Sequence, residues 1–395
     1  MMIMKLVIYS IILNNHQACV ADELWELTNH SYCFVELVKP NDSNKKGGTK
    51  NYRNRPYLLC AWESDESYCK AMKLAMTAEC CIFSGLPALP FEKARLKKGL
   101  LSFDMSERWL KKGWINLFSP TILHMFLTYH FGGWKHKPLY KLCCSAFAAE
   151  DQFKLFTFRD KCYKWGYFTS VNNFDDEVIQ QSISSGSSIK LMWCARFLTW
   201  KHPELPVLMA HRLKQKGLNF ILDMYGEGKL KNSSIKLVKK LGVDDVVRFI
   251  DNKPNDELIA DMRKHNIFIF TSDRNEGWGA VANESMAAGC VLVASDDIGS
   301  TPYLIDAGKT GFSFRSPVSS SGFDNPDINA LDDLCQKVEW LFKNPDQRRK
   351  MAYYSISKMR LEYSPRIVAA RLLQLIENLR SGKDSPYEDG PCSKA

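Results

Sequence analysis

The sequence lacks a C-x-x-C pair, although it contains 13 cysteines. Without that spacing neither a zinc site nor a dithiol redox motif is indicated, and the eight histidines also lack metal-ligand spacing. Two adjacent pairs, Cys80-Cys81 and Cys143-Cys144, lie in apolar runs, which is typical of buried reduced thiols. Because such thiols persist in the cytosol, we predict a cytoplasmic protein, and we expect neither a metal nor a cofactor.

The sequence also has no stretch of about 18 uncharged apolar residues, the length that a membrane-spanning helix requires. The apolar run after Lys5 is short and leads into Asn14-Asn15-His16 without a small-residue cleavage site. We therefore expect a first buried strand here, not a signal peptide. No repeat of solenoid length and no nucleic-acid-binding module is found.

The composition is that of an ordinary globular protein, with 45% hydrophobic and 25% charged residues. A length of 395 residues is enough for two domains of ordinary size. The net charge of +9 fits an anionic partner, such as a sugar nucleotide, a lipid phosphate or a membrane surface. It is too diffuse to indicate nucleic acid.

The stretch from Thr271 to Gly311 carries the strongest local signal. Ile267–Phe270 just before it is a short apolar run of the kind that forms a buried parallel strand. A turn with two glycines follows, then the good helix formers of Ala280–Ala288, and then a second apolar run, Val291–Ala294. Alternating strand and helix segments, which also fill the first half of the chain, predict α/β domains with parallel sheets.

Two acids stand out in this stretch. Glu276 lies in the glycine turn and Glu284 lies in the helix, with seven residues between them. Their separation along a helix is about 12 Å at ~1.5 Å per residue, which suits one acid at a sugar and the other at a ribose. The free N–H groups near Gly279, Ala280 and Val281 would then face a diphosphate. Alternatively, each acid is only a cap or a dipole partner of the helix.

The motif NEGWGAVANE, followed by SMAAGCVLVAS, resembles the retaining GT-B glycosyltransferases of family 4. The similarity extends from about Ile189 to Leu379, and more faintly back to the N-terminus. It implies an α/β fold with two Rossmann-like domains facing across a cleft and a closing helix that crosses back to the first domain. We place the acceptor domain at residues 1–187, the nucleotide-sugar domain at 188–363, the closing helix at 364–380, and a disordered tail at 381–395.

The resemblance also assigns the donor site. Arg196 and Lys201, which follow the strand Ile189–Cys194, would stabilise the departing diphosphate without a metal. Glu276 would bind the sugar hydroxyls, and Glu284 the ribose hydroxyls. The other donor contacts are expected from loops and the helix start: Gly226, Ile250, Asn252, Gly279, Ala280 and Val281.

Two residues of the first half are candidates for the acceptor side. His16 lies in the loop after the first strand, which often faces the cleft in GT-B proteins, although this loop lacks the glycine pair of many family members. It can equally be a surface histidine. Glu107 follows the expected strand Leu100–Phe103 and would contact the sugar or the acceptor; the alternative is a solvated acid that caps a helix.

The stretch Trp109–Trp134 combines aromatic residues with Lys111, Lys112 and the following Lys135. Such a mixture can form an interfacial membrane face. It can also be a core helix whose lysines reach solvent at its rim.

The resemblance implies an enzyme that transfers a hexose from a UDP- or GDP-sugar to a saccharide or lipid-linked acceptor, with retention of configuration. The partners would be that donor, that acceptor and, peripherally, the cytoplasmic face of the inner membrane. Assembly of capsule, exopolysaccharide or O-antigen is the implied setting. The alternatives are a non-catalytic nucleotide-sugar-binding subunit and another GT-B enzyme, such as a sugar-nucleotide epimerase or a phosphorylase.

Overall fold

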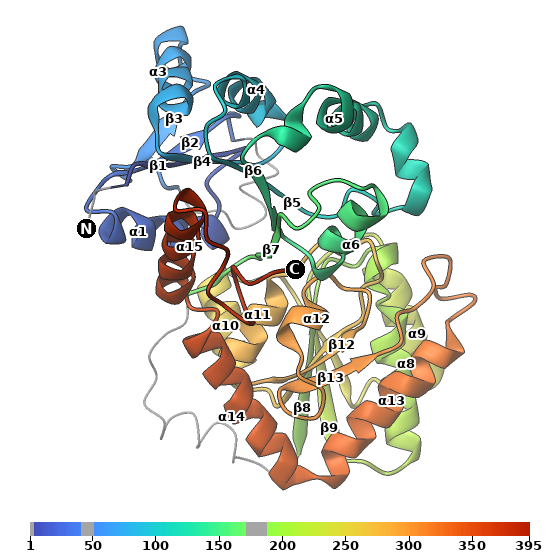
Figure 1. Ribbon diagram of the computed structural model, residues 1–395. Coiled ribbons are helices and arrows are strands. Elements are labelled where there is room, and N and C mark those ends of the chain that lie inside the picture. Colours follow the sequence, from blue (N-terminus) through green and yellow to red (C-terminus); the bar gives the residue numbers. More distant parts are fainter. Residues whose placement is uncertain (1–3, 41–50, 171–187) are drawn as a thin grey trace. The chain divides into compact units, whose positions relative to one another are not determined.

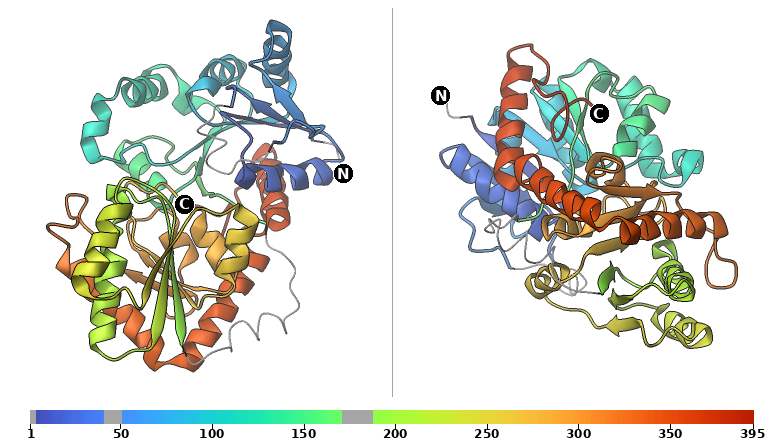
Figure 2. Two further views of the ribbon diagram at one scale, coloured as in Figure 1. Left: turned by 180° about the vertical axis from the view of Figure 1, so that it is seen from behind. Right: turned by 90° about the horizontal axis from the view of Figure 1, so that it is seen from below.

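A computed structural model describes residues 4–40, 51–170 and 188–395 (Figure 1). The chain divides into two compact units. The first unit combines residues 1–170 with 362–395, and the second consists of residues 171–361. Each unit contains one parallel sheet with helices on both faces (Figure 2).

The sheet of the first unit has seven strands in the order β3-β2-β1-β4-β5-β6-β7. Its short apolar strands are largely buried, which is typical of parallel strands covered on both faces. The order reverses between β1 and β4, and this point is a topological switch point. The strands are β1 (Leu6–Ser10), β2 (Tyr32–Glu36), β3 (Leu58–Cys60), β4 (Cys80–Phe83), β5 (Ser102–Ser106), β6 (Leu139–Cys143) and β7 (Cys162–Lys164).

Three helices of the first unit, α1, α3 and α6, follow a residue whose side chain accepts from free backbone N–H groups. The Asn14 side chain accepts from two N–H groups at the start of α1, and Ser64 caps α3. The C-terminal helix α15 belongs to this unit, where it packs against α1 (Figure 1). The helices are α1 (Asn15–Leu27), α3 (Asp65–Thr77), α4 (Leu89–Lys97), α5 (Pro120–Phe131), α6 (Ala146–Lys154) and α15 (Pro365–Arg380), with short 3-10 turns η1 (Leu86–Ala88), η2 (Gly113–Phe118) and η3 (Trp134–His136).

The prediction of a disordered tail at 381–395 is wrong. Tyr163 in the edge strand β7 forms an antiparallel bridge with Lys394, and the Lys164 N–H donates to the Ser393 carbonyl over 2.8 Å. Cys392 and Ser393 are completely buried. The polar composition misled the prediction because the tail is held by backbone hydrogen bonds to an edge strand, and these bonds do not depend on the side chains.

Removing residues 383–395 should therefore expose the backbone of β7. We expect the truncated protein to unfold about 5 °C or more below the intact chain, since a few kilocalories per mole are large against total stability. We also expect concentration-dependent association through the open edge, measurable by light scattering. An unchanged melting temperature without association would contradict this role of the tail.

The sheet of the second unit has six strands in the order β10-β9-β8-β11-β12-β13. Its switch point lies between β8 and β11. The strands are β8 (Ile189–Cys194), β9 (Phe220–Tyr225), β10 (Val247–Ile250), β11 (Ile267–Phe270), β12 (Val291–Ser295) and β13 (Gly311–Phe314). The helices are α8 (Glu204–Gln215), α9 (Lys231–Leu241), α10 (Asn255–Met262), α11 (Val281–Ala287), α12 (Thr301–Leu304), α13 (Ile328–Lys343) and α14 (Pro345–Leu361), with the turn η4 (Thr199–Lys201).

Candidate functional site in the second unit

Two loops leave the carboxyl ends of β8 and β11, on either side of the switch point. The first loop carries Arg196 and Lys201, and the second carries Glu276. Because β8 and β11 are paired in register, with Trp193 opposite Ile269, both loops start at the same edge of the sheet. Open α/β sheets bind ligands at this place.

The two loops meet through a charged pair. The Lys201 ammonium contacts the Glu276 carboxylate, and the Ser272 hydroxyl donates to the same carboxylate oxygen over 3.1 Å. The two side chains are only 12% and 15% exposed. The ammonium also lies 5.6 Å from the centre of the Phe270 ring. A cation and an anion that the sequence separates by 75 positions therefore share one half-buried place.

Buried hydrogen bonds fix the backbone beneath this pair. The Thr271 hydroxyl donates to the Lys201 carbonyl over 2.6 Å and accepts from the Trp193 indole over 2.9 Å. The Asp273 N–H donates to the Trp200 carbonyl over 2.9 Å. The first loop is thus tied to the second at several points before any ligand is present.

Two glycines at this edge of the sheet lie close to neighbouring atoms. Gly279 has φ +80°, and a Cβ atom there would lie 2.4 Å from the Phe270 ring. Gly226, after β9, has φ +129°, and its Cβ would lie 2.1 Å from the Ala195 carbonyl oxygen. Both positions therefore require glycine. The Gly226 N–H donates to the Ile250 carbonyl over 3.1 Å, which places two predicted donor contacts side by side next to the Arg196 loop.

The remaining predicted donor contacts are accessible. Arg196 is exposed, and its guanidinium forms no ion pair with any residue that the structure describes. Asn252 is exposed two residues beyond the end of β10. In the described chain, the N–H groups of Gly279, Ala280 and Val281 at the start of α11 donate to no other backbone group. An anion at this edge would thus meet unused donors.

Glu284 differs from Glu276 because no cation of the described residues forms an ion pair with it. It lies in α11 with 7% of its surface exposed, and burial raises the pKa of its carboxyl from 4.5 to about 7, opposed by a hydrogen bond with Asn255. A buried carboxyl without a charge partner destabilises the fold when it ionises. Hydroxyl donors from a ligand would supply the missing partners.

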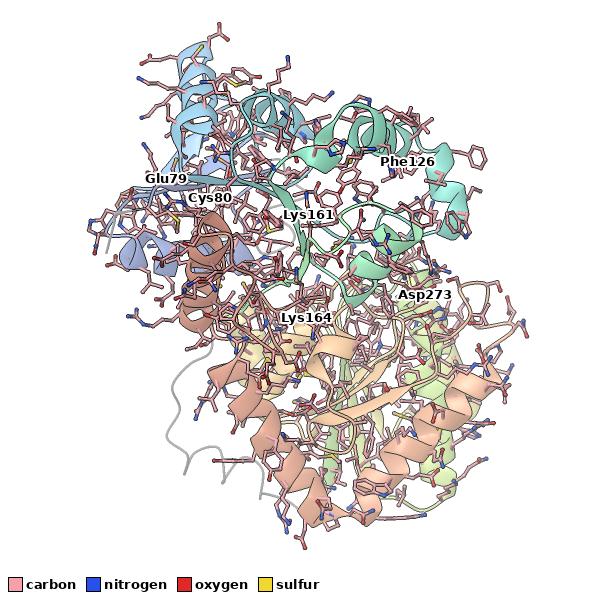
Figure 3. The ribbon with its side chains drawn as sticks, in the orientation of Figure 1. Glu79, Cys80, Phe126, Lys161, Lys164 and Asp273 are labelled. Carbon is pink, nitrogen blue, oxygen red and sulfur yellow. The ribbon has the colours of Figure 1, made fainter. Side chains whose placement is uncertain are left out.

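One buried residue beside the site was not predicted. His202 follows Lys201 directly and is completely buried between Glu204 and Asp273. Its Nδ1 lies 2.9 Å from Glu204, and its Nε2 lies 3.5 Å from Asp273. Although burial acts to lower it, hydrogen bonds to the two acids raise the pKa of His202 to about 9. Asp273, labelled in Figure 3, lies in the loop after β11.

The two predicted acceptor-side residues lie in the first unit and share a neighbour. The Tyr167 hydroxyl donates to Glu107 over 2.8 Å, and the Tyr167 ring stacks on His16 with centroids 6.3 Å apart. Burial lowers the pKa of His16. No helix starts at Glu107, so the helix-capping interpretation does not hold. Tyr167 itself was not predicted.

The Trp109–Trp134 stretch is partly buried and partly exposed. Trp109, Tyr129 and Trp134 are buried, and Phe126, labelled in Figure 3, packs on the same cluster. Other apolar side chains of η2 and α5 are exposed. They are Trp114 (59%), Ile115 (67%), Phe118 (85%), Leu123 (44%), Leu127 (44%) and Phe131 (81%). We call these six residues the α5 patch.

Other features concern metals, membranes and thiols. Among the described residues no group of three or more His, Cys, Asp or Glu side chains is arranged to hold a metal ion. Across the same residues, no helix has both the length and the apolar character to cross a bilayer. All 13 cysteines are free thiols.

Comparison with known proteins identifies similar sequences for part of the chain. Residues 175–358 match the model of the family Glycosyl transferases group 1. The D-inositol 3-phosphate glycosyltransferase of Corynebacterium efficiens is 40% identical over 75 residues, 19% of this chain and 17% of that protein. The enzyme of the same name from Corynebacterium urealyticum is 29% identical over 161 residues, 40% of this chain and 34% of that protein. The chain thus matches only a sixth to a third of the length of these relatives.

Solved structures cover much more of the chain. Anabaena Alr3699/HepE in complex with UDP matches with a TM-score of 0.68 and 12% identity, over 96% of this chain and 100% of that one. A glycosyltransferase from Rickettsia africae matches with a TM-score of 0.65 and 12% identity, over 96% and 99%. The expected fold of two Rossmann-like domains of the GT-B type is therefore confirmed, and the second unit carries the group 1 glycosyltransferase segment.

Proposed function

We propose that this chain is a glycosyltransferase that moves a hexose from a UDP- or GDP-sugar to a saccharide or lipid-linked acceptor, with the anomeric configuration retained. The observation that carries the proposal is the contact between Lys201 and Glu276 beside the exposed Arg196, at the switch point of a sheet in the matched family segment. A sugar diphosphate needs both kinds of group, cations for the phosphates and a carboxylate for the hydroxyls.

The chemistry follows from these charges. As the bond between the anomeric carbon and the diphosphate breaks, negative charge grows on the leaving oxygen, and Arg196 and Lys201 stabilise it. Glu276 holds the sugar hydroxyls, and Glu284 the ribose hydroxyls. The acceptor hydroxyl attacks from the face that the diphosphate leaves, and the diphosphate takes its proton. This front-side displacement through an oxocarbenium-like state retains the configuration. His16 and Glu107 are the proposed acceptor contacts.

The test is a panel of sugar nucleotides incubated with and without saccharide and lipid-linked acceptors. We expect release of UDP or GDP that depends on acceptor, with a retained linkage in the product by NMR. Conversion of the donor into an epimer without a saccharide product would identify the epimerase alternative. Tight nucleotide binding without turnover of any donor would identify the non-catalytic subunit.

A second part of the proposal concerns where in the cell the protein works, and it rests on the α5 patch. Leu123, Leu127 and Phe131 recur every four residues, so they line one face of α5. No acidic residue occurs between Glu107 and Glu150, whereas this segment contains six Lys and Arg residues. Two of the six, Arg108 and Lys141, are buried in ion pairs, which leaves four lysines. An exposed apolar face without negative charge fits an anionic bilayer surface. We propose that the protein works at the cytoplasmic face of a membrane, on an acceptor of a polysaccharide assembly pathway.

Replacing Phe118 and Phe131 by serine should weaken binding to vesicles that contain phosphatidylglycerol. Each buried phenylalanine contributes about 1.5–3 kcal/mol, so the double variant should bind more than about tenfold less tightly in a sedimentation assay. The control variant removes Val318 and Leu361, which are exposed by 54% and 71% in the second unit, and should bind as the wild type does. Equal vesicle binding by wild type and the Phe118/Phe131 variant would refute membrane docking through this patch.

A further inference from the structure

The segment that joins Lys201 to α8 contains a buried charge cluster that the proposed mechanism does not use. His202 is completely buried, with the carboxylates of Glu204 and Asp273 on its two nitrogens. Glu204 and Asp273 are themselves 99% buried or more. These three side chains come from two different loops, since Glu204 starts α8 and Asp273 follows β11.

The position of each member connects the cluster to the donor site. His202 is the next residue after Lys201, and its backbone is held in the left-handed region at φ +46°. On the other side, the Asp273 carboxylate accepts from the Asn275 N–H over 2.8 Å, and its carbonyl accepts from the Glu276 N–H over 3.0 Å. A shift of either carboxylate relative to the imidazole would therefore displace Lys201 or Glu276.

The charge balance of the cluster favours an imidazolium. The described groups around His202 are Glu204, Asp273 and the adjacent Lys201, whose ammonium is directed to Glu276. A neutral imidazole can donate to only one of its two acids, and the second carboxylate would then be buried beside a lone pair. Among the described residues, neither the His202 Nε2 nor the nearest Asp273 oxygen, 3.5 Å away, has a hydrogen-bond partner. A proton on each nitrogen serves both acids.

We propose that His202 is a positioning residue, a buried imidazolium clip that sets the distance between the loop of Lys201 and the loop of Glu276. The inference rests on the proposed function, in which those two residues hold the donor. His202 does not touch the reacting atoms. It acts by keeping the Lys201 ammonium and the Glu276 carboxylate at a fixed distance. The donor requires this distance because its diphosphate contacts the first group while its sugar hydroxyls contact the second.

The test replaces His202 by asparagine, a residue that tolerates the left-handed conformation but carries no charge. The matched control is His265→Asn. His265 is also a buried histidine beside a carboxylate, 3.0 Å from Asp223, but it lies away from both loops. We expect both variants to melt at lower temperature. Only His202→Asn should lose donor turnover, by about 30-fold or more in kcat/KM, in the range that small misplacements of catalytic groups produce.

The pH profile separates positioning from stability. The wild type should lose activity above about pH 9, where His202 gives up its second proton, while His202→Asn should lack this limb. Equal losses in the two histidine variants, or an unchanged alkaline limb in His202→Asn, would overturn the proposal. If His202→Asn does not fold, Asp273→Asn applies the same test from the other side of the clip, with the same two outcomes.

Failure of the proposed function would look different. If the wild type transfers no sugar, two other measurements still test whether His202 acts as a clip. They are the hydrogen exchange of residues 195–204 and 271–279, and the NMR signals of the His202 ring at pH 7.5. A doubly protonated ring, and faster exchange of both loops in His202→Asn but not in His265→Asn, would support it. A neutral ring, or exchange unchanged by the substitution, would refute it.

Discussion

Replacing Glu284 by glutamine is expected to make the protein more stable and less able to bind its donor. The carboxyl is buried and pairs with no cation in the part of the chain that the structure describes, and its pKa of about 7 lies above the ordinary 4.5. The fold therefore favours the protonated form. Stability from this group is complete below about pH 4.5 and is lost as the pH rises through 7. Since 1.36 kcal/mol corresponds to one pKa unit, ionisation costs about 3 kcal/mol by pH 8.

Glutamine is uncharged at every pH, so the variant should not incur this cost. The difference in unfolding free energy between variant and wild type should be small at pH 5 and should favour the variant by about 2–3 kcal/mol at pH 8. Urea denaturation at the two pH values measures it. A difference that is the same at both pH values would show that Glu284 does not titrate in this range.

Donor affinity should change in the opposite direction. Ribose hydroxyls donate to a carboxylate more strongly than to an amide, and charge-assisted bonds contribute about 1.5–3 kcal/mol each. We expect Glu284→Gln to bind UDP or GDP about 100-fold more weakly, measured by calorimetry. In the wild type the affinity should fall as the pH drops below 7, because the carboxyl must lose its proton to accept both hydroxyls.

Glu92→Gln is the matched control. Glu92 is also a buried acid of a helix, with 3% of its surface exposed, and burial followed by repulsion from Asp104 raises its pKa well above the usual value. It lies in α4 of the first unit, whereas Glu284 lies in the second. It should gain stability at alkaline pH while nucleotide affinity is unchanged. If both variants lost nucleotide affinity, the loss in Glu284→Gln could not be assigned to a contact between Glu284 and the ribose.

The sequence predicted the sheets and the elements that carry the donor site for a physical reason. Short apolar runs buried on both faces, such as Ile267–Phe270, can only be parallel strands in a chain that alternates them with helices. Loops after such strands converge at one edge of the sheet, so Lys201 and Glu276 meet despite their distance in the chain. The alternation of strands and helices therefore indicated the edge of the sheet, and the family resemblance assigned Lys201 and Glu276 to a donor site there.

Contacts that depend on how single side chains turn were not predictable in this way. Tyr167 joins His16 to Glu107, and His202 lies between two acids, although nothing in their spacing indicates either contact. The prediction of a disordered tail was wrong for another reason. The polar residues of the tail bind to β7 through their backbone groups. The composition of a segment predicts whether its side chains are buried. It does not predict which strand is at the edge of the sheet and can pair with that segment.

Removing the charge of Lys201 is expected to lower kcat strongly. Lys201→Met keeps most of the side-chain volume but leaves the diphosphate without one of its two cations. Deleting one group that stabilises a growing oxyanion typically costs about 3–4 kcal/mol, so kcat at saturating donor should fall about 100- to 1,000-fold. Lys358→Met is the control, because Lys358 is also a nearly buried lysine that pairs with an acid, Asp306 at 3.0 Å, away from the switch point. A kcat within threefold of wild type would remove Lys201 from the proposed mechanism.

The double variant Lys201→Met/Glu276→Gln separates catalysis from folding. Lys201→Met alone leaves the Glu276 carboxylate half-buried without its cation, and an unpaired charge in such a place destabilises the fold. Removing the carboxylate charge as well should restore part of the lost melting temperature, because neither group then remains unpaired. Activity should not return, since the donor needs both charges. If activity and melting temperature recovered together, Lys201 and Glu276 would be a structural ion pair, and the donor would have to bind elsewhere.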